Sequence, residues 1–499
     1  MKIAQLFVAA VFAASQAQAQ QAPVALTIYN QDFAVARTSI DLDLHAGLNE
    51  VTTDRVTSRL EPDSVVLRDP SGKRLIHVLE QNYDAAVVNQ DWLLKKYEGK
   101  TIDFQTVTPQ GSQIVQGRII RAGGQADGAY NPYGQYIGNP QTQPLIEVNG
   151  KMQFQLPGTP LFPATINGLL LKPTLRWQIQ SEKTERFSAE LAYITGGLDW
   201  NATYNVVLPS SSDVTGDEKA DVVGWVTIHN QSGTEFTEAR IKLMAGDVAK
   251  IQADRFRGSE FRDQIAFATA GPAAAPQVTQ KPFDDFHLYD LNRTVALRDG
   301  EIKQVQFIDA ADVTVRRDYL YDGAAQLQPY YDDGNINENR GYGLDNGNTK
   351  VRIVEEIKNS EANHLGMPLP AGRIRLYRRD ADGQMEFIGE DTINHTSAED
   401  TVKLSTGAAF DVKGSRRQTD FHINQQDRLV DESFEIKVTN QKAQPVNVTV
   451  VEHLYRGVNW EIRDKSSDFI KRDSRTVEFP IQVPAKGETT LTYSVRYTW

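Results

Sequence analysis

Four side chains are the best candidates for catalytic chemistry in this sequence, although no short catalytic motif surrounds them. Asp199, His229, Asp247 and His453 each border a predicted strand, and carboxylates and imidazoles are the usual general acids and bases. The sequence lacks a Gly-x-Ser-x-Gly elbow, Ser-x-x-Lys, His-Glu-x-x-His and a phosphate-binding glycine loop. A hydrolase whose site is assembled between domains from these four residues is therefore one hypothesis. A non-catalytic protein is favoured over it.

A metal site is the second kind of chemistry to consider. The eight histidines are scattered, with no pair at the short spacings that bring two rings to one zinc ion. The nearest approach to a calcium site is a loop with oxygen-bearing side chains at every second position: Asp333, Asn335, Asn337 and Asn339. An EF-hand loop needs glycine where Glu338 stands and a bidentate glutamate where Leu344 stands. A solvated loop is favoured over a calcium site, and no other cofactor is expected.

Short β-strands must position all of these side chains. Alternating apolar and polar residues, with turn signals at intervals of roughly 8 to 12 residues, extend through most of the chain. The pattern predicts an all-β protein of several immunoglobulin-like β-sandwiches with a small N-terminal mixed β module. The predicted divisions are a signal peptide (1–19), an N-terminal module (20–173, with a polar insertion at 123–144), a central sandwich (174–323, with an Ala/Pro-rich excursion at 268–282), a polar insertion (324–349) and a C-terminal sandwich (350–499).

One short helix and one tight hairpin are predicted inside the N-terminal module. Asn89 or Asp91 can cap a helix at 92–97, and Gly99 is expected to end it in the left-handed conformation. The dipeptide Asn149-Gly150 lies between two alternating segments, which is a strong signal for a two-residue hairpin turn.

The central and C-terminal sandwiches contain a repeated pattern. The strand at 200–208 is expected to pair with the strand at 222–228. The segment 226–243, two strands around an Asn-Gln turn, is echoed by 436–450, and both are predicted to be hairpins. Four tryptophans in apolar strand settings are expected to anchor the cores: Trp200, Trp225, Trp460 and Trp499.

Charge and cysteine content exclude several function classes. The chain has 65 acidic and 53 basic residues and a formal net charge of -12, spread without blocks. A nucleic-acid partner, which needs a basic face, is therefore not expected. The absence of cysteine excludes disulfides, thiolate chemistry and an N-terminal lipidated cysteine.

The N-terminus predicts export. Residues 1–19 combine an early charge, Lys2, with an apolar run at 3–14 and a small-residue end at 17–19, as in a cleaved signal peptide. No later apolar run approaches the roughly 18 residues of a transmembrane helix, so a periplasmic or secreted protein is expected. Residues 491–499 alternate and end on an aromatic residue, which resembles the last strand of an outer-membrane β-barrel. The barrel is kept as an alternative, and a last strand that closes a sandwich is favoured.

With these segments laid out, the chain resembles a bacterial family known as domain of unknown function 4139, whose relatives include proteins named mucoidy inhibitor A. The resemblance implies no catalytic residue that could be transferred to this sequence. The segments that carry it are 192–204, 224–233, 242–248, 368–372, 387–391, 451–455 and 491–499.

The function that these observations favour is that of an exported cell-envelope protein with a structural or protein-interaction role. An envelope protein or a glycan is the expected kind of partner, and the sequence leaves the oligomeric state open. The hydrolase would act on envelope polysaccharide or peptide. A pocket lined by carboxylates or histidines with shifted pKa values would favour the hydrolase over the interaction module.

Overall fold

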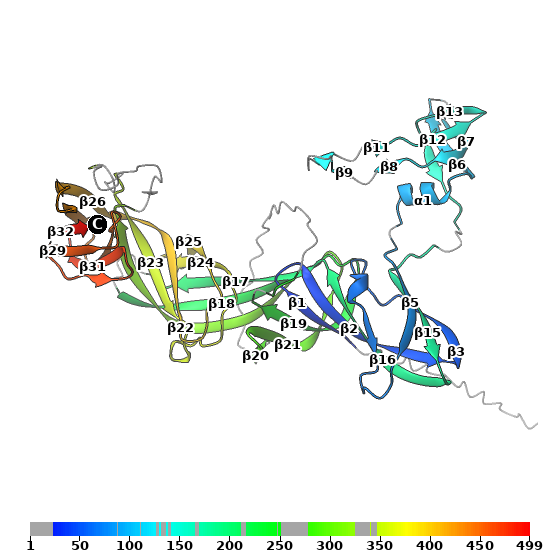
Figure 1. Ribbon diagram of the computed structural model, residues 1–499, viewed down its shortest axis with the longest axis horizontal. Helices are drawn as coiled ribbons and strands as arrows, with labels where there is room; N and C mark the ends of the chain where they lie inside the picture. Colours follow the sequence, from blue (N-terminus) through cyan, green and yellow to red (C-terminus); the bar gives the residue numbers. More distant parts are fainter. Residues whose placement is uncertain are drawn as a thin grey trace, which may run out of the picture.

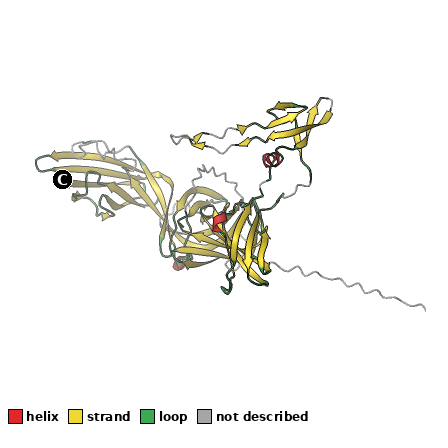
Figure 2. Cartoon of the chain, turned by 45° about the vertical axis from the view of Figure 1, so that its right-hand side comes forward, coloured by secondary structure: helices red, strands yellow, loops and turns green. Residues whose placement is uncertain are grey.

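The computed structural model describes residues 23–86, 88–109, 111–125, 129–130, 136–137, 141–164, 169–210, 216–246, 248–250, 278–324, 340 and 347–499. Within these ranges the protein is nearly all β, arranged in several sheets, which confirms the expected fold class of β-sandwiches. The sandwiches follow one another along the long axis of the molecule, and a small module stands apart from them (Figures 1 and 2).

The first sandwich combines strands from distant parts of the chain. Its seven-stranded sheet has the order β20-β21-β19-β1-β2-β16-β4, and a second sheet has the order β3-β15-β5. Strand β1 pairs in parallel with β19, with Val24 opposite Ala239. The expected boundary at residue 173 therefore does not separate two sandwiches. The strands are β1 (Val24–Tyr29), β2 (Phe33–Leu44), β3 (Gly47–Thr53), β4 (Val66–Arg68), β5 (His77–Asp84), β15 (Thr174–Ser181), β16 (Glu185–Gly196), β19 (Phe236–Ala245), β20 (Thr279–Phe283) and β21 (Phe286–Leu297).

A thirteen-stranded sheet extends through the rest of the molecule. Its main path is β25-β24-β17-β18-β22-β23-β26-β27-β32-β29, and β28, β30 and β31 branch from it. Strands β22, with 21 residues, and β26, with 24 residues, continue from one sandwich into the next. The strands are β17 (Leu198–Leu208), β18 (Gly216–Asn230), β22 (Ile302–Asp322), β23 (Lys350–Lys358), β24 (Gly372–Arg379), β25 (Met385–Ile393), β26 (Thr401–Asn424), β27 (Leu429–Asn440), β28 (Val446–His453), β29 (Trp460–Lys465), β30 (Ile470–Lys471), β31 (Thr476–Val483) and β32 (Gly487–Thr498).

Four charged side chains form a buried row across this sheet. Arg378 donates hydrogen bonds of 2.6 and 2.8 Å to the two carboxylate oxygens of Glu218. Arg317 donates bonds of 2.8 and 2.7 Å to Glu355 Oε1 and lies 4.0 Å from Glu218. Burial raises the pKa of Glu355, against the opposing effect of Arg317. The row alternates in charge, so each buried ion has a partner of opposite sign.

The row separates two hydrophobic cores. Along β22, Val315 belongs to the first core and Tyr319 to the second, and Arg317 lies between them on the same face. Along β23, Ile357 and Val351 belong to the first and second core, and Glu355 lies between them. The inward-facing positions therefore continue through the junction while their chemistry changes from apolar to charged and back.

Three buried asparagines lie where the chain passes from one strand to another that is not its hydrogen-bonded neighbour. Asn230 donates to the carbonyls of Thr234 and Arg298 at 2.9 and 3.0 Å. Asn440 donates in the same way to Gln444 and Pro484 at 2.8 and 3.1 Å. The repeated pattern thus has a shared structure, but it is not a hairpin. Strand β19 pairs with β1 and β21, and β28 pairs with β22 and β31, so the predicted pairings within 226–243 and 436–450 are wrong.

Asn359 makes the third corner of this kind. Its side-chain amide donates to the carbonyls of Met367 and Ser397, both at 2.9 Å. Its side-chain oxygen accepts the backbone N–H of Gly366 at 3.0 Å, as Asn440 accepts that of Lys442 at 2.9 Å. All three asparagines are fully buried. The sandwiches therefore repeat one corner, which the sequence pattern indicated at only two of its three positions.

The small module is inserted between β5 and β15 and has its own hydrophobic core. Its five strands have the order β13-β12-β7-β6-β14. The predicted local structure is confirmed: Asn89 caps α1 by accepting the N–H of Trp92 at 2.8 Å, and Gly99 has a φ of 78°. Its elements are α1 (Gln90–Lys96), β6 (Thr101–Thr108), β7 (Gly111–Arg121), β12 (Leu145–Val148), β13 (Lys151–Gln153) and β14 (Thr159–Leu161).

The Asn149-Gly150 turn and the polar insertion also belong to this module. Asn149 and Gly150 have φ values of 50° and 72° and join β12 to β13, as the sequence predicts. Within the expected insertion at 123–144, the described residues form two short strand pairs. They are β8 (Gly124–Gln125) with β11 (Gln141–Thr142), and β9 (Ala129–Tyr130) with β10 (Tyr136–Ile137). Two 3₁₀ turns elsewhere complete the elements: η1 (Pro62–Ser64) and η2 (Glu361–Asn363).

Two further expectations differ from the structure in part. Residues 279–282 were expected in an irregular excursion, but they belong to β20, which pairs with β21. Of the four tryptophans expected in cores, only Trp200 is buried, and Trp499 is 44% exposed. Trp499 falls on the same side as the buried Tyr497 but lies beyond the end of β32, which ends at Thr498.

The final strand behaves as the sandwich interpretation predicts. Strand β32 pairs with both β27 and β29 and therefore lies inside the sheet. Its alternate side chains Leu491, Tyr493, Val495 and Tyr497 are buried in the second core.

Candidate functional site

One pair of the candidate catalytic residues is in contact. Asp199 on β17 lies opposite His229 on β18, and Asp199 Oδ1 is 2.7 Å from His229 Nδ1. The hydrogen bond to Asp199 raises the pKa of His229, although partial burial lowers it. Both side chains face the outer surface of the sheet, with exposed fractions of 36% and 27%. The pair can hold a proton, and His229 still presents its other ring nitrogen.

His453 forms a second pair, with a residue that was not among the candidates. Its Nε2 is 3.0 Å from Asp322 Oδ2, at the end of β22. This hydrogen bond raises the pKa of His453. The imidazole stacks on Tyr455 at a centroid distance of 5.4 Å, and the Tyr455 hydroxyl donates to the carbonyl of Ala324. The pair thus fastens β28 and the loop after it to the end of β22.

The candidate residues do not form one site. His229 lies opposite Ile302 at the start of β22, whereas His453 contacts Asp322 at its end. The 21 residues of this strand, at about 3.3 Å each, place roughly 60 Å between the two imidazoles. Asp247 lies outside the described residues. In the described part of the chain, no side-chain hydroxyl hydrogen bonds to either ring, so neither pair has the geometry of an activated nucleophile.

A larger group of ionisable side chains is buried at the end of the second core. Arg416 Nε lies 3.0 Å from both carboxylate oxygens of Glu452, and the Tyr493 hydroxyl donates to Glu452 at 2.5 Å. Beside them, Arg456 donates to Glu432 at 2.8 Å. Burial raises the pKa of Tyr493 well above its usual value. Each charge has an opposite partner inside the sandwich, which is the arrangement of a structural cluster.

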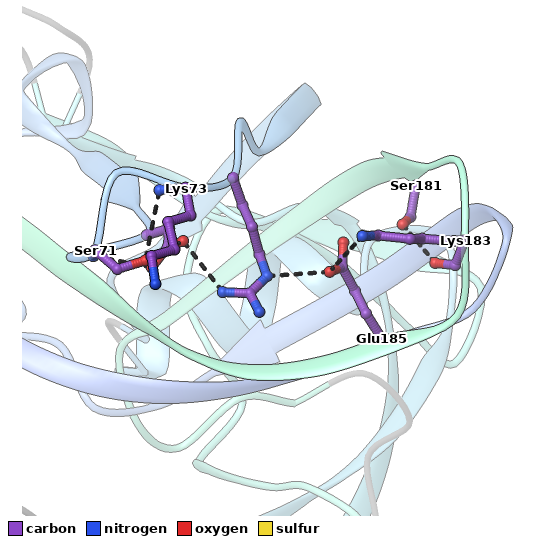
Figure 3. A network of polar contacts seen from close by, with 7 residues as sticks. Ser71, Lys73, Ser181, Lys183 and Glu185 are labelled. Carbon is purple, nitrogen blue, oxygen red and sulfur yellow. Dashed lines mark hydrogen bonds and ion pairs between the residues drawn. The ribbon is translucent and has the colours of Figure 1, made fainter.

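A surface network fastens a loop of the first sandwich. Arg74 donates to Asp69 at 3.2 Å and to Glu185 at 3.1 Å, and Ser71 donates to Asp69 at 2.8 Å. Figure 3 shows Ser71 and Lys73 at one end of the network and Glu185, Lys183 and Ser181 at the other. The network joins the loop between β4 and β5 to the turn between β15 and β16. Its contacts are satisfied within the network, so we assign it a structural role.

Two of the predicted features, the calcium loop and the signal peptide, fall on residues that are not described. The calcium-like loop at Asp333, Asn335, Asn337 and Asn339, like the expected signal peptide at 1–19, lies outside the described residues. Across the described ranges, no three His, Cys, Asp or Glu side chains are grouped as metal ligands. None of the helices in those ranges has both the length and the apolar character to cross a bilayer.

The outer face of β25, β24, β17, β18 and β22 combines aromatic side chains with polar ones. It contains the Asp199–His229 pair at one end. Because Ala202 and Tyr204 are buried, the alternate residues of β17 face outward: Asp199, Asn201, Thr203 and Asn205. The sequence predicted this strand and its pairing with β18. It did not predict that β24 lies parallel to β17 and brings Tyr377 to the same face.

A small cavity lies under this sheet, among the described residues. An apolar cavity of about 20 Å³ lies there, lined by Tyr204, Val222 and seven aliphatic side chains. It has room for about one small molecule the size of water and no polar group to hold it.

Comparison with known proteins adds no relative. No family model matches the sequence, and no curated protein matches it significantly.

Proposed function

We propose that this protein is an exported, periplasmic or secreted component of the bacterial cell envelope that acts as a structural and protein-interaction module. The proposal includes membership of the domain of unknown function 4139 family, on the segments named above. The signal-like residues 1–19 support export.

The continuity of the large sheet is the observation that carries the proposal. Strands β22 and β26 are shared between successive sandwiches, so continuous strands join these sandwiches. A rigid series of sandwiches of this kind holds distant surfaces at a fixed separation. The small module, with its own core and inserted at the β5–β15 hairpin, adds a further surface at one side (Figure 1). These are features of a scaffold that presents binding surfaces.

Cell fractionation followed by capture tests this proposal. Cells that express the full precursor with a C-terminal tag are subjected to osmotic shock, treated with a cross-linker and used for affinity purification. We expect the mature protein in the periplasmic or secreted fraction, starting near residue 20, with a defined cross-linked envelope protein. Retention of the protein in the cytoplasm with residues 1–19 intact would contradict export. Recovery without any cross-linked partner would contradict the interaction role.

A further inference from the structure

We propose that the outer face of β25, β24, β17, β18 and β22 binds an uncharged oligosaccharide. The inference rests on the proposed function and deepens it by naming the class of ligand. The centre of the face is a cross-strand row in which Thr203 lies opposite Trp225, and Trp225 lies opposite Gln306. Trp225 is half-buried. A half-buried indole has a fixed orientation and still presents part of its ring to a ligand.

Neutral polar side chains lie on the strands at both sides of this indole. On β17, Asn201 and Asn205 flank Thr203 on the same face, and Gln304 accompanies Gln306 on β22. Amides and hydroxyls donate and accept hydrogen bonds at once, and sugar hydroxyls do the same. The apolar C–H face of a pyranose ring packs against an aromatic ring. A tryptophan among amides and a hydroxyl therefore suits both surfaces of a sugar.

A second aromatic group lies on the same face. Tyr377 on β24 lies opposite Phe387 on β25, with ring centroids 5.8 Å apart, and Phe387 is 56% exposed. Arg373, four residues before Tyr377 on β24, is the register neighbour of Thr203. Four residues along the strands and two strand spacings place Trp225 and Tyr377 roughly 16 Å apart. The two aromatic groups thus suit a ligand several sugar units long.

The charges of the face favour an uncharged ligand. Two arginines and one histidine on the face each have a carboxylate partner on the same face: Arg375 with Glu390 at 3.4 Å, Arg379 with Asp221 at 3.2 Å, and His229 with Asp199 at 2.7 Å. Arg373, beside Thr203 on the same face, also takes part in a polar or electrostatic interaction. A ligand of either charge would have to compete with these pairs. A neutral polyhydroxyl ligand gains hydrogen bonds without disturbing them.

Titration of the mature full-length protein with defined hexasaccharides tests the inference. The probes are linear hexasaccharides of glucose, mannose, galactose and N-acetylglucosamine, with hexagalacturonate as the anionic comparison, and binding is measured by tryptophan fluorescence and calorimetry. We expect at least one neutral probe to bind, and to bind more tightly than hexagalacturonate. Trp225→Ala and Asn205→Ala should each weaken that binding about tenfold or more.

A matched variant separates this face from a general effect of removing an aromatic residue. Trp460→Ala removes another half-buried tryptophan, on β29 of the C-terminal sandwich, and should bind the probe as the wild type does. Circular dichroism and melting temperature show whether each variant is folded. If Trp225→Ala does not fold, sugar binding by Asn205→Ala tests the inference.

Several results would overturn the inference. One is that no neutral probe binds, and another is that hexagalacturonate binds more tightly than every neutral probe. A third is that the wild type, Trp225→Ala and Asn205→Ala bind the probe equally. The proposed interaction role would survive these results if the cross-linked protein partner were still captured. Loss of that partner in Trp225→Ala, without sugar binding by the wild type, would show that the face docks protein instead.

Discussion

Asn230, Asn359 and Asn440 hold the same place in successive sandwiches. Each side-chain amide bonds one carbonyl in its own loop and one in a distant loop. The distant loop contains a residue of positive φ in each case: Gly300 at 73°, Glu399 at 68° and Lys486 at 52°. A single buried amide thus satisfies backbone groups that would otherwise have no partner where the chain leaves a strand.

Replacement of such an asparagine should be costly. Asn440→Ala leaves two loop carbonyls and one N–H without their partner inside the protein, so we expect a loss of about 2 to 4 kcal/mol in the free energy of unfolding. Chemical denaturation followed by fluorescence measures it. Asn447→Ala, at an exposed position on β28 of the same sandwich, should change stability by less than about 0.5 kcal/mol. Similar losses in the two variants would contradict the role assigned to the corner.

The His453–Asp322 pair should make stability depend on pH. The pKa of His453 is raised in the folded protein, first by its hydrogen bond with Asp322. Such a histidine stabilises the fold fully below its unfolded pKa, and this contribution is lost as the pH rises through the folded pKa. Asp322→Asn should therefore cost more stability at about pH 5.5 than at about pH 9. Denaturation at both pH values measures the difference.

An exposed aspartate provides the comparison for this variant. Asp41 lies on the outer face of β2, and Asp41→Asn should have a small effect that is the same at both pH values. An equal loss at both values for Asp322→Asn would show that its partner is not a protonated imidazole.

At the scale of elements, the charged row on β18, β22, β23 and β24 marks the junction of two cores. Arg317→Met would leave Glu355 buried without its cation, and we expect a loss of about 3 to 5 kcal/mol. The double variant Arg317→Met/Glu355→Met removes both charges and should recover most of that stability, because methionine fills the space and joins the two cores. A double-mutant cycle on the free energy of unfolding measures this coupling.

A surface pair shows what an ordinary ion pair contributes. Arg417 pairs with Glu435 at 2.9 Å on the outer face, with its side chain 69% exposed. Arg417→Met should cost less than about 1 kcal/mol. If Arg317→Met were equally mild, the row would not be the closely paired, dehydrated junction that the structure describes.

Elements also show what the sequence could and could not predict. Local signals narrowed the helix cap to Asn89 or Asp91 and predicted the turn at Asn149-Gly150 and the β17–β18 pair. Alternation predicted which residues of β32 face inward. The local sequence does not distinguish a strand that pairs with the preceding strand from one that pairs with other strands. For this reason the pattern of 226–243 predicts a hairpin, whereas β19 pairs with β1 and β21. The outer face with Trp225 and Tyr377 depends on the same non-local register.

At the scale of the whole molecule, we expect two units of unfolding. The sandwiches share β22 and β26, so they should unfold together, whereas the small module has a separate core and should unfold separately. Calorimetry of the mature protein should show two transitions. A variant with residues 90–161 replaced by a short Gly/Ser linker should lose the smaller transition and keep the larger one at its original temperature. A shift of the larger transition would show that the module stabilises the sandwiches.

The pairing of β1 with β19 has a consequence for the order of events during synthesis. Val24 meets its partner Ala239 only after 215 further residues have been made, which takes about 10 to 40 s at ordinary elongation rates. Through this interval the first apolar strand has an unpaired edge, and contacts so distant in sequence form slowly. The nascent chain is thus most exposed to aggregation and proteolysis at its beginning, and a chaperone that shields this segment until β19 emerges would improve the yield of folded protein.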